Sequence, residues 1–119
     1  MREDRPRLTV SKDGDVMTVG FSDRKILDEM SIMQIGDQLN ALVAEVEKPK
    51  IVLDFSSVAH MSSSALGVLI TAHKRIREKG GQLRLCNIES AIYEVFVITR
   101  LNEIFTICDS REEAMETLA

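Results

Sequence analysis

The sequence has 119 residues, of which 45% are hydrophobic and 29% are charged. This length supports one compact domain over residues 1–119, because two shorter halves would each bury too little surface to stay folded. The 15 Lys and Arg residues against 19 Asp and Glu residues give a net charge of −4. Such a chain has no basic field to attract nucleic acid or anionic lipid, so neither is expected as a partner.

The sequence also predicts a cytoplasmic protein without direct membrane insertion. No apolar stretch approaches the roughly 18 residues that a membrane span needs. Residues 1–7, MREDRPR, are charged where a signal peptide is apolar. Cys86 and Cys108 lie in apolar segments, and two cysteines are too few to staple a domain of this length. We expect both thiols to be buried and free.

Three strands are predicted in the first half of the chain. Segments 8–12 and 16–21 flank the turn sequence Asp13-Gly14, a pattern typical of an antiparallel hairpin. The short apolar run 51–53 lies between charged residues and is rich in β-branched side chains. This pattern favours a strand that is buried on both faces.

A first helix is expected from about Ser31. Ser31 and Gln34 fit a capping box, and Pro49 marks the end of the helix. Its apolar residues recur at helical spacing and are Ile32, Ile35, Leu39, Leu42, Val43 and Val46. A second helix is expected after the serine triplet 62–64. Its apolar face is formed by Leu66, Leu69, Ile70 and Ile76.

A third helix is predicted over about residues 90–99 from its helical spacing. The residues expected on its buried face are Ala91, Val95 and Ile98. Strands are expected at 82–88, before this helix, and near 104–107, after it.

The last helix is expected to start at Ser110, which fits a capping box with Glu113. Its packing residues are Ala114 and Leu118. The order of elements implies parallel strands joined by right-handed helical crossovers. The predicted fold class is therefore α/β: a mixed β-sheet with an N-terminal antiparallel hairpin, parallel strands joined by helical crossovers, and about four helices.

The sequence lacks the residue patterns of the common metal, nucleotide-binding and serine-nucleophile sites. The residues His60, His73, Cys86 and Cys108 do not have the spacing of a zinc site. There is no glycine-rich phosphate loop of the dinucleotide or P-loop kind. A serine nucleophile would need a GxSxG elbow and a base, but His73 lies along the same predicted helix and points away from its start. We therefore predict a protein that is not an enzyme and holds no metal or cofactor.

The serine triplet 62–64 stands where a buried strand, after a short turn, leads into a helix. Backbone N–H groups at a helix start are unpaired, and the helix dipole places positive charge there. Such a position tolerates an anion. The other interpretation is that Ser62 or Ser63 only caps the helix, and the triplet alone leaves both open.

The sequence from Ile51 to Cys86 is IVLDFSSVAHMSSSALGVLITAHKRIREKGGQLRLC. It resembles the STAS domain of anti-sigma factor antagonists, bacterial switch proteins that release sigma factors from anti-sigma kinases. The family pattern is an apolar strand ending in Asp or Asn, a turn, and a serine pair that opens a helix. The matching residues are Leu53, Asp54, Phe55, Met61, Ser63, Ser64, Leu66, Gly67, Val68 and Leu69. Further matches extend the resemblance over nearly the whole chain, at 26–28, 97–101, 104–105 and 109–114.

The resemblance implies particular site residues. The phosphoacceptor of the family falls on Ser63, and Ser62, which stands where the family usually has Asp, is a competing acceptor. Ala65 and Lys25 stand where the family usually has Gly. The family's Asp before the first helix falls on Asp28. The residues implied at the partner surface are Asp28, Met61, Ser62, Ser64 and Ala65.

The function implied by the resemblance is that of a phosphorylation-switched binding module. Without phosphate on Ser63, it would sequester an anti-sigma factor with serine kinase activity and so free a sigma factor. Phosphorylation would release the anti-sigma factor, and a serine phosphatase would be a further partner. One alternative is a STAS scaffold or lipid-transport accessory subunit without such switching, and another is a nucleotide-binding domain. Self-association also stays open.

Overall fold

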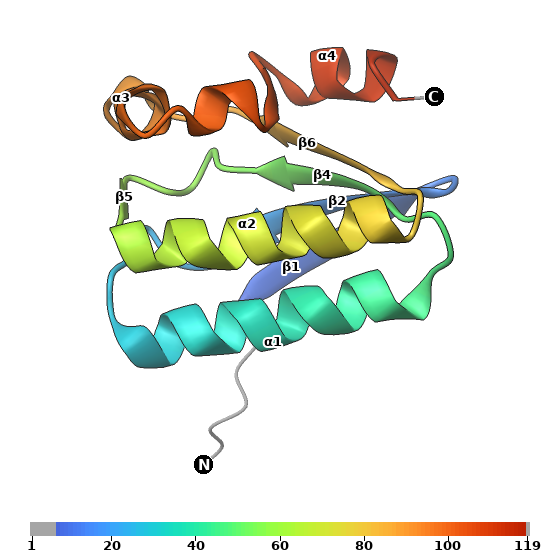
Figure 1. Ribbon diagram of the computed structural model, residues 1–119, viewed down its shortest axis with the longest axis horizontal. Coiled ribbons are helices and arrows are strands. Elements are labelled where there is room, and N and C mark those ends of the chain that lie inside the picture. Colours follow the sequence, from blue (N-terminus) through green and yellow to red (C-terminus); the bar gives the residue numbers. More distant parts are fainter. Residues whose placement is uncertain (1–6, 119) are drawn as a thin grey trace.

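The main sheet has five strands in the order β1-β2-β4-β6-β7 (Figure 1). The structure, a computed structural model, describes residues 7–118, so residues 1–6, which bear on the predicted lack of a signal peptide, lie outside it. The strands are β1 (Leu8–Asp13), β2 (Val16–Phe21), β4 (Lys50–Asp54), β6 (Gln82–Cys86) and β7 (Thr106–Cys108). β1 and β2 pair antiparallel, and the other neighbours pair parallel. The predicted mixed sheet with an N-terminal hairpin is confirmed.

The hairpin turn depends on its glycine. Asp13 pairs with Val16, which leaves Gly14 and Asp15 as a two-residue loop. Gly14 has a φ of 65°, a left-handed conformation that glycine adopts without a Cβ clash and that matches the twist of a tight hairpin.

Four α-helices lie within residues 7–118, as predicted. They are α1 (Glu29–Glu45), α2 (Ser63–Glu78), α3 (Ser90–Ile98) and α4 (Arg111–Glu116). A short 3₁₀ helix, η1 (Leu101–Glu103), follows α3. α1 and α2 lie side by side on one face of the sheet, and α4 packs on β4, β6 and β7 (Figure 1).

The two faces of the sheet carry separate apolar clusters. The larger cluster fills the space between the sheet and helices α1, α2 and α3. The smaller one lies beneath α4 and consists of Val16, Val52, Cys86, Cys108 and Ala114. Strand β4 contributes Ile51 and Leu53 to the larger cluster and Val52 to the smaller, and all three are fully buried. The prediction of a strand buried on both faces is confirmed.

Both cysteines are buried and free, as the sequence predicts. Burial raises the pKa of Cys86 to about 12, with the Asp54 carboxylate as the next cause, and burial also raises the pKa of Cys108. At pH 8 the folded protein should therefore alkylate with iodoacetamide at Cys86 at least about a hundred-fold more slowly than an exposed thiol does. Mass spectrometry checks this, with a urea-unfolded sample as the fully labelled control. Rapid labelling of the folded protein at Cys86 would show that this thiol is not buried.

Helix α1 begins earlier than predicted. Its N-cap is Asp28, whose Oδ2 accepts a hydrogen bond from the backbone N–H of Ser31 at 2.9 Å. The prediction that Ser31 and Gln34 form the capping box is wrong. Ser31 is buried inside the first turn, and Gln34 Oε1 accepts a hydrogen bond from Arg7 Nε at 2.8 Å. The Asp cap was missed because it lies before the first residue of the apolar pattern.

The buried face of α3 differs from the predicted one by a rotation of about one residue. Ile92 and Phe96 are buried, whereas Ala91, Val95 and Ile98 lie on the exposed side. Ile98 is 80% exposed. Helix α3 is apolar on nearly every side, so its hydrophobic spacing does not select the face that packs on the sheet.

Candidate functional site

Two short parallel strands bring the starts of α1 and α2 together. β3 (Lys25–Ile26) pairs with β5 (His60–Met61), and Ile26 lies opposite Met61. The backbone N–H of Ser62 donates to the Ile26 carbonyl at 3.0 Å. Asp28 then caps α1, and Ser62 occupies the N-cap position of α2. The sequence predicted neither strand, because two residues give no detectable periodicity.

These helix starts lie beside the edge of the main sheet at which the parallel strands end (Figure 1). Asp54, the last residue of β4, fixes the connection to β5. Its Oδ1 accepts hydrogen bonds from the backbone N–H of Ser56 at 2.9 Å and from Asn87 Nδ2 at 3.0 Å. The edge at the carboxyl ends of the strands is where open α/β sheets bind their ligands.

Ser62 has the N-cap position but lacks the N-cap hydrogen bond. Its backbone is extended, with φ −83° and ψ 164°, yet its hydroxyl makes no capping contact. The Oγ atom is buried and has no hydrogen-bond partner among residues 7–118. Because a buried hydroxyl is out of reach of a kinase, this geometry argues against Ser62 as the competing phosphoacceptor.

Ser63 and Ser64, the first residues of α2, are both exposed but lie on different sides of the helix. Ser64 lines a groove between α1 and α2, together with Gly36 and Gly67. Ser63 precedes Ile70 by seven residues, which is two helical turns, so these two side chains share one side of α2. The triplet therefore presents one buried hydroxyl and two exposed hydroxyls that face different neighbours.

The start of α2 carries the positive end of the helix dipole, and no acidic side chain of α2 compensates it. The first turn of α2 has no acidic residue, whereas α1 has Asp28 as its cap and Glu29 in its first turn. The backbone N–H groups of Ser63 and Ser64 have no acceptor among the described residues. A phosphate on Ser63 would interact favourably with this helix end, by about 0.3–1 kcal/mol. The site can therefore accept a dianion without unfolding the helix.

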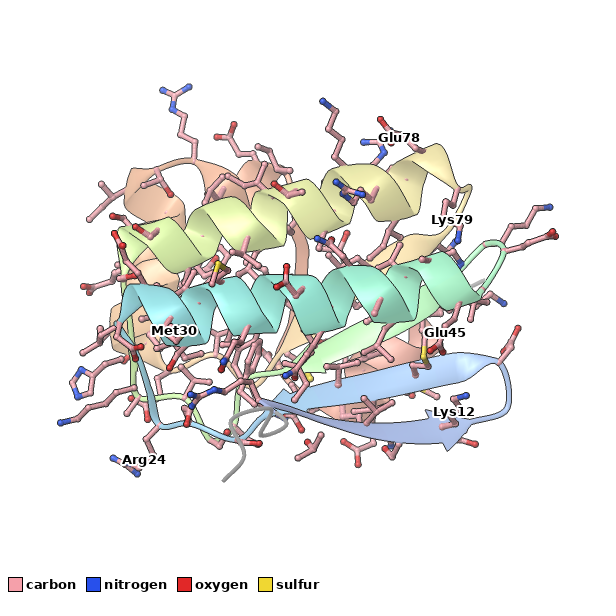
Figure 2. All side chains as sticks on the ribbon, turned by 90° about the horizontal axis from the view of Figure 1, so that it is seen from below. Lys12, Arg24, Met30, Glu45, Glu78 and Lys79 are labelled. Carbon is pink, nitrogen blue, oxygen red and sulfur yellow. The ribbon has the colours of Figure 1, made fainter. Side chains whose placement is uncertain are left out.

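Exposed apolar side chains surround the helix starts on the α1 side. Leu27, Met30 and Met33 are each more than half exposed, and Met30 lies at the first turn of α1 (Figure 2). Flexible methionine side chains suit a protein-binding surface. The sequence analysis missed this surface. The available signal was that Met30 and Met33 stand outside the predicted apolar stripe of α1 and so should be exposed.

The other residues predicted at the partner surface have different surroundings. Asp28 is exposed, and Met61 is half-buried against the large core cluster. Ala65 is only 5% exposed, so its placement at a partner surface is corrected: its side chain lies in the core. Ile70, predicted on the apolar face of α2, is instead 40% exposed.

Replacing Asp28 with Ala should lower the melting temperature at pH 7 by ~2–5 °C, because the cap of α1 is lost. Hydrogen bonding to Ser31 lowers the pKa of Asp28, so its contribution is fully present above the unfolded pKa of about 4 and disappears as the pH falls through the lower folded value. Thermal unfolding of both proteins at pH 7 and at pH ~2 checks this. Glu29→Ala, which removes a neighbouring charge but no cap, is the control. An equal loss at both pH values would refute the capping role.

Neither a metal site nor a membrane helix is found in residues 7–118. No group of three His, Cys, Asp or Glu side chains there is arranged to hold a metal ion, and no helix is both long and apolar enough to span a membrane. His73 packs edge-on against Phe105, with ring centroids 5.1 Å apart. Burial, followed by the charge of Arg77, lowers the pKa of His73. It is a packing residue and not a base for the serines.

The mixed five-stranded sheet, with two neighbouring helices that start at one edge, defines a small α/β domain of the STAS type. The STAS domain family matches residues 10–114, and the chain belongs to this family. BtrV of Bordetella bronchiseptica, assigned as an anti-sigma factor antagonist, is 37% identical over 82 residues, which are 66% of this chain and 71% of BtrV.

Solved structures have the same fold. An anti-sigma factor antagonist (STAS) domain protein from Planctomyces limnophilus superposes with a TM-score of 0.83 at 24% identity, over 94% of this chain and 97% of that one. The Bacillus cell fate determinant SpoIIAA, in its phosphorylated form, superposes with a TM-score of 0.68 at 17% identity, over 92% and 96% of the two chains. At these identities the likeness concerns the fold.

Proposed function

We propose that this protein is an anti-sigma factor antagonist, a binding module without enzymatic activity that is switched by phosphorylation of Ser63. While Ser63 is unmodified, the module sequesters an anti-sigma factor with serine kinase activity, and a sigma factor is freed. The observation that carries the proposal is the exposed Ser63 at the uncompensated start of α2, in a chain of the STAS family. The name of BtrV supports it.

Electrostatics explain why a phosphate on Ser63 would release the partner. Phosphorylation adds roughly −1.5 to −2 charges at neutral pH. In the free protein these charges face water and the positive end of α2. In a complex they would be desolvated, at a cost of several kcal/mol unless a cation meets them. Because about 1.4 kcal/mol changes an affinity tenfold, half of this cost turns a tight complex into a weak one.

A competition experiment tests the proposed function. A serine-kinase anti-sigma factor from the same genome is loaded with its fluorescently labelled sigma factor, and this protein is titrated in. We expect release of the sigma factor, seen as a fall in fluorescence anisotropy. A sigma factor that stays bound at saturating concentrations, with every such kinase of the genome, would rule the proposal out.

One observation favours a second function, that of a STAS scaffold or lipid-transport accessory subunit. Ser62 replaces the Asp that the family usually has beside the acceptor, and its hydroxyl is turned inward. In this case the surface around Ser63 would dock a partner permanently. Co-purification with membrane transporter subunits, in place of a kinase, would select this function.

A further inference from the structure

Helix α3 exposes an apolar side that is not covered within residues 7–118. Val95 is 38% exposed and Ile98 is 80% exposed. Glu94 is the one charged residue among the nine residues of α3. A helix that is apolar on nearly every side is normally buried, and exposed apolar patches mark interaction sites. Burial of Ile92 and Phe96 against the core leaves this second apolar side free.

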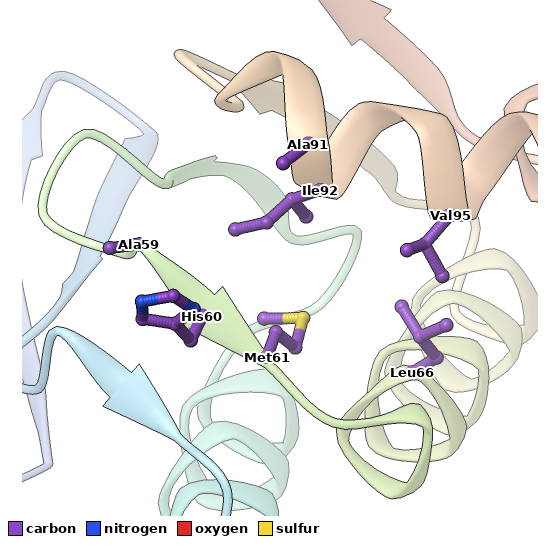
Figure 3. Close-up of a pocket in the computed structure, with 7 residues that line it drawn as sticks. All are labelled: Ala59, His60, Met61, Leu66, Ala91, Ile92 and Val95. Atoms are coloured by element: carbon purple, nitrogen blue, oxygen red, sulfur yellow. The ribbon is translucent and has the colours of Figure 1, made fainter.

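A groove runs between this side of α3 and helix α2. A pocket of about 140 Å³ in this groove is lined by Met61, Leu66, Ala91 and Val95, among others. Leu66 and Val95 point toward each other across it (Figure 3). Ile70 follows Leu66 by four residues and Ile98 follows Val95 by three, so each lies on the same side of its helix as a lining residue, and both are exposed. We call this feature the α2–α3 groove; apolar walls of this kind suit the apolar stripe of a single helix.

Charge distinguishes the α2–α3 groove from the surface further along α2. Lys74 and Arg77 lie further along α2, beside Ile104, with Glu78 as the one carboxylate lining that part of the surface. The 140 Å³ pocket is lined by no acidic residue. A complementary ligand therefore carries acidic side chains at the end that meets Lys74 and Arg77. A second copy that placed its own α3 against the groove would offer only Glu94 to these cations.

The groove also continues the surface at which Ser63 lies. Ser63, Ile70 and Lys74 are spaced by seven and four residues and so share one side of α2. We propose that the α2–α3 groove binds one amphipathic helix of the anti-sigma factor, with apolar residues at helical spacing and acidic residues at one end. This inference rests on the proposed function, since it assigns a second contact to the same partner.

The test compares matched variants in binding to the serine-kinase anti-sigma factor, measured by isothermal titration calorimetry. Ile98→Asp places a charge in the groove and should weaken binding at least ~30-fold. Val97→Asp, on the other side of the same helix, should bind like the wild type. Lys74→Glu should weaken binding ~10-fold and Arg75→Glu, which turns away from the groove, should not. Circular dichroism melts confirm that each variant is folded.

The possible results distinguish failure of the groove assignment from failure of the proposed function. If the wild type binds and Ile98→Asp binds equally well, the groove assignment is overturned while the function stands. If the wild type binds no anti-sigma factor, both are overturned. If sedimentation shows that the free protein is a dimer that Ile98→Asp dissociates, a second copy covers the groove and the assignment is again overturned.

Discussion

Ser63→Asp should bind the anti-sigma factor at least ~100-fold more weakly than the wild type, whereas Ser63→Ala should bind at least as tightly. Ser63 is exposed and lies at the first position of α2. A carboxylate there is stabilised by the helix dipole in the free protein but loses its hydration when a partner covers it. The substitution therefore weakens the complex and does not destabilise the fold.

Ser64→Asp is the matched control, because it adds the same charge one residue later. Ser64 is also exposed, but it faces the groove with α1. We expect a smaller loss of affinity for this variant and no fall in the melting temperature of any of the three, because the helix dipole favours an Asp in the first turn of α2. Titration calorimetry measures the affinities. Equal affinities of Ser63→Ala and Ser63→Asp would remove the switch and leave a constitutive docking surface.

Phe96→Ala should lower the free energy of unfolding by about 3–5 kcal/mol, whereas Ile98→Ala should change it by less than about 0.5 kcal/mol. Phe96 is fully buried and packs edge-on against Phe105, with ring centroids 5.9 Å apart. Truncating it leaves a cavity in the large core cluster. Ile98 is 80% exposed, so its truncation removes few contacts.

Urea unfolding followed by circular dichroism checks this pair of variants. The sequence pattern predicts the reverse order, because it places Ile98 on the buried face of α3. A larger loss for Ile98→Ala than for Phe96→Ala would show that α3 packs on the sheet through the predicted face. It would also close the α2–α3 groove, since Ile98 would no longer be exposed.

The sequence predicts the elements whose pattern is unambiguous. Strand β4 has no polar residue between Lys50 and Asp54, so only a position buried on both faces fits it. The cap of α4 was also predictable from local residues: Ser110 Oγ accepts from the Glu113 N–H at 3.1 Å, and Glu113 Oε1 accepts from the N–H of Asp109 at 2.7 Å, one residue before the predicted partner. Such features depend on neighbouring residues alone.

The features that need tertiary structure were not predictable. The strands β3 and β5 are too short to show a pattern, yet they set the two helix starts side by side. The side of α3 that packs is chosen by the sheet and η1, and not by its own sequence. For the serine triplet, spacing and resemblance point to the helix start. The inward position of the Ser62 hydroxyl and the outward one of Ser63 follow only from the fold.

The site of modification is the most direct test of the account. The protein is incubated with a serine-kinase anti-sigma factor from the same genome and ATP, and the phosphate is located by tandem mass spectrometry. We predict a single phosphate on Ser63, none on Ser62, and no incorporation into Ser63→Ala. A phosphate on Ser62 or on a residue outside the start of α2, or full incorporation into Ser63→Ala, would contradict the account.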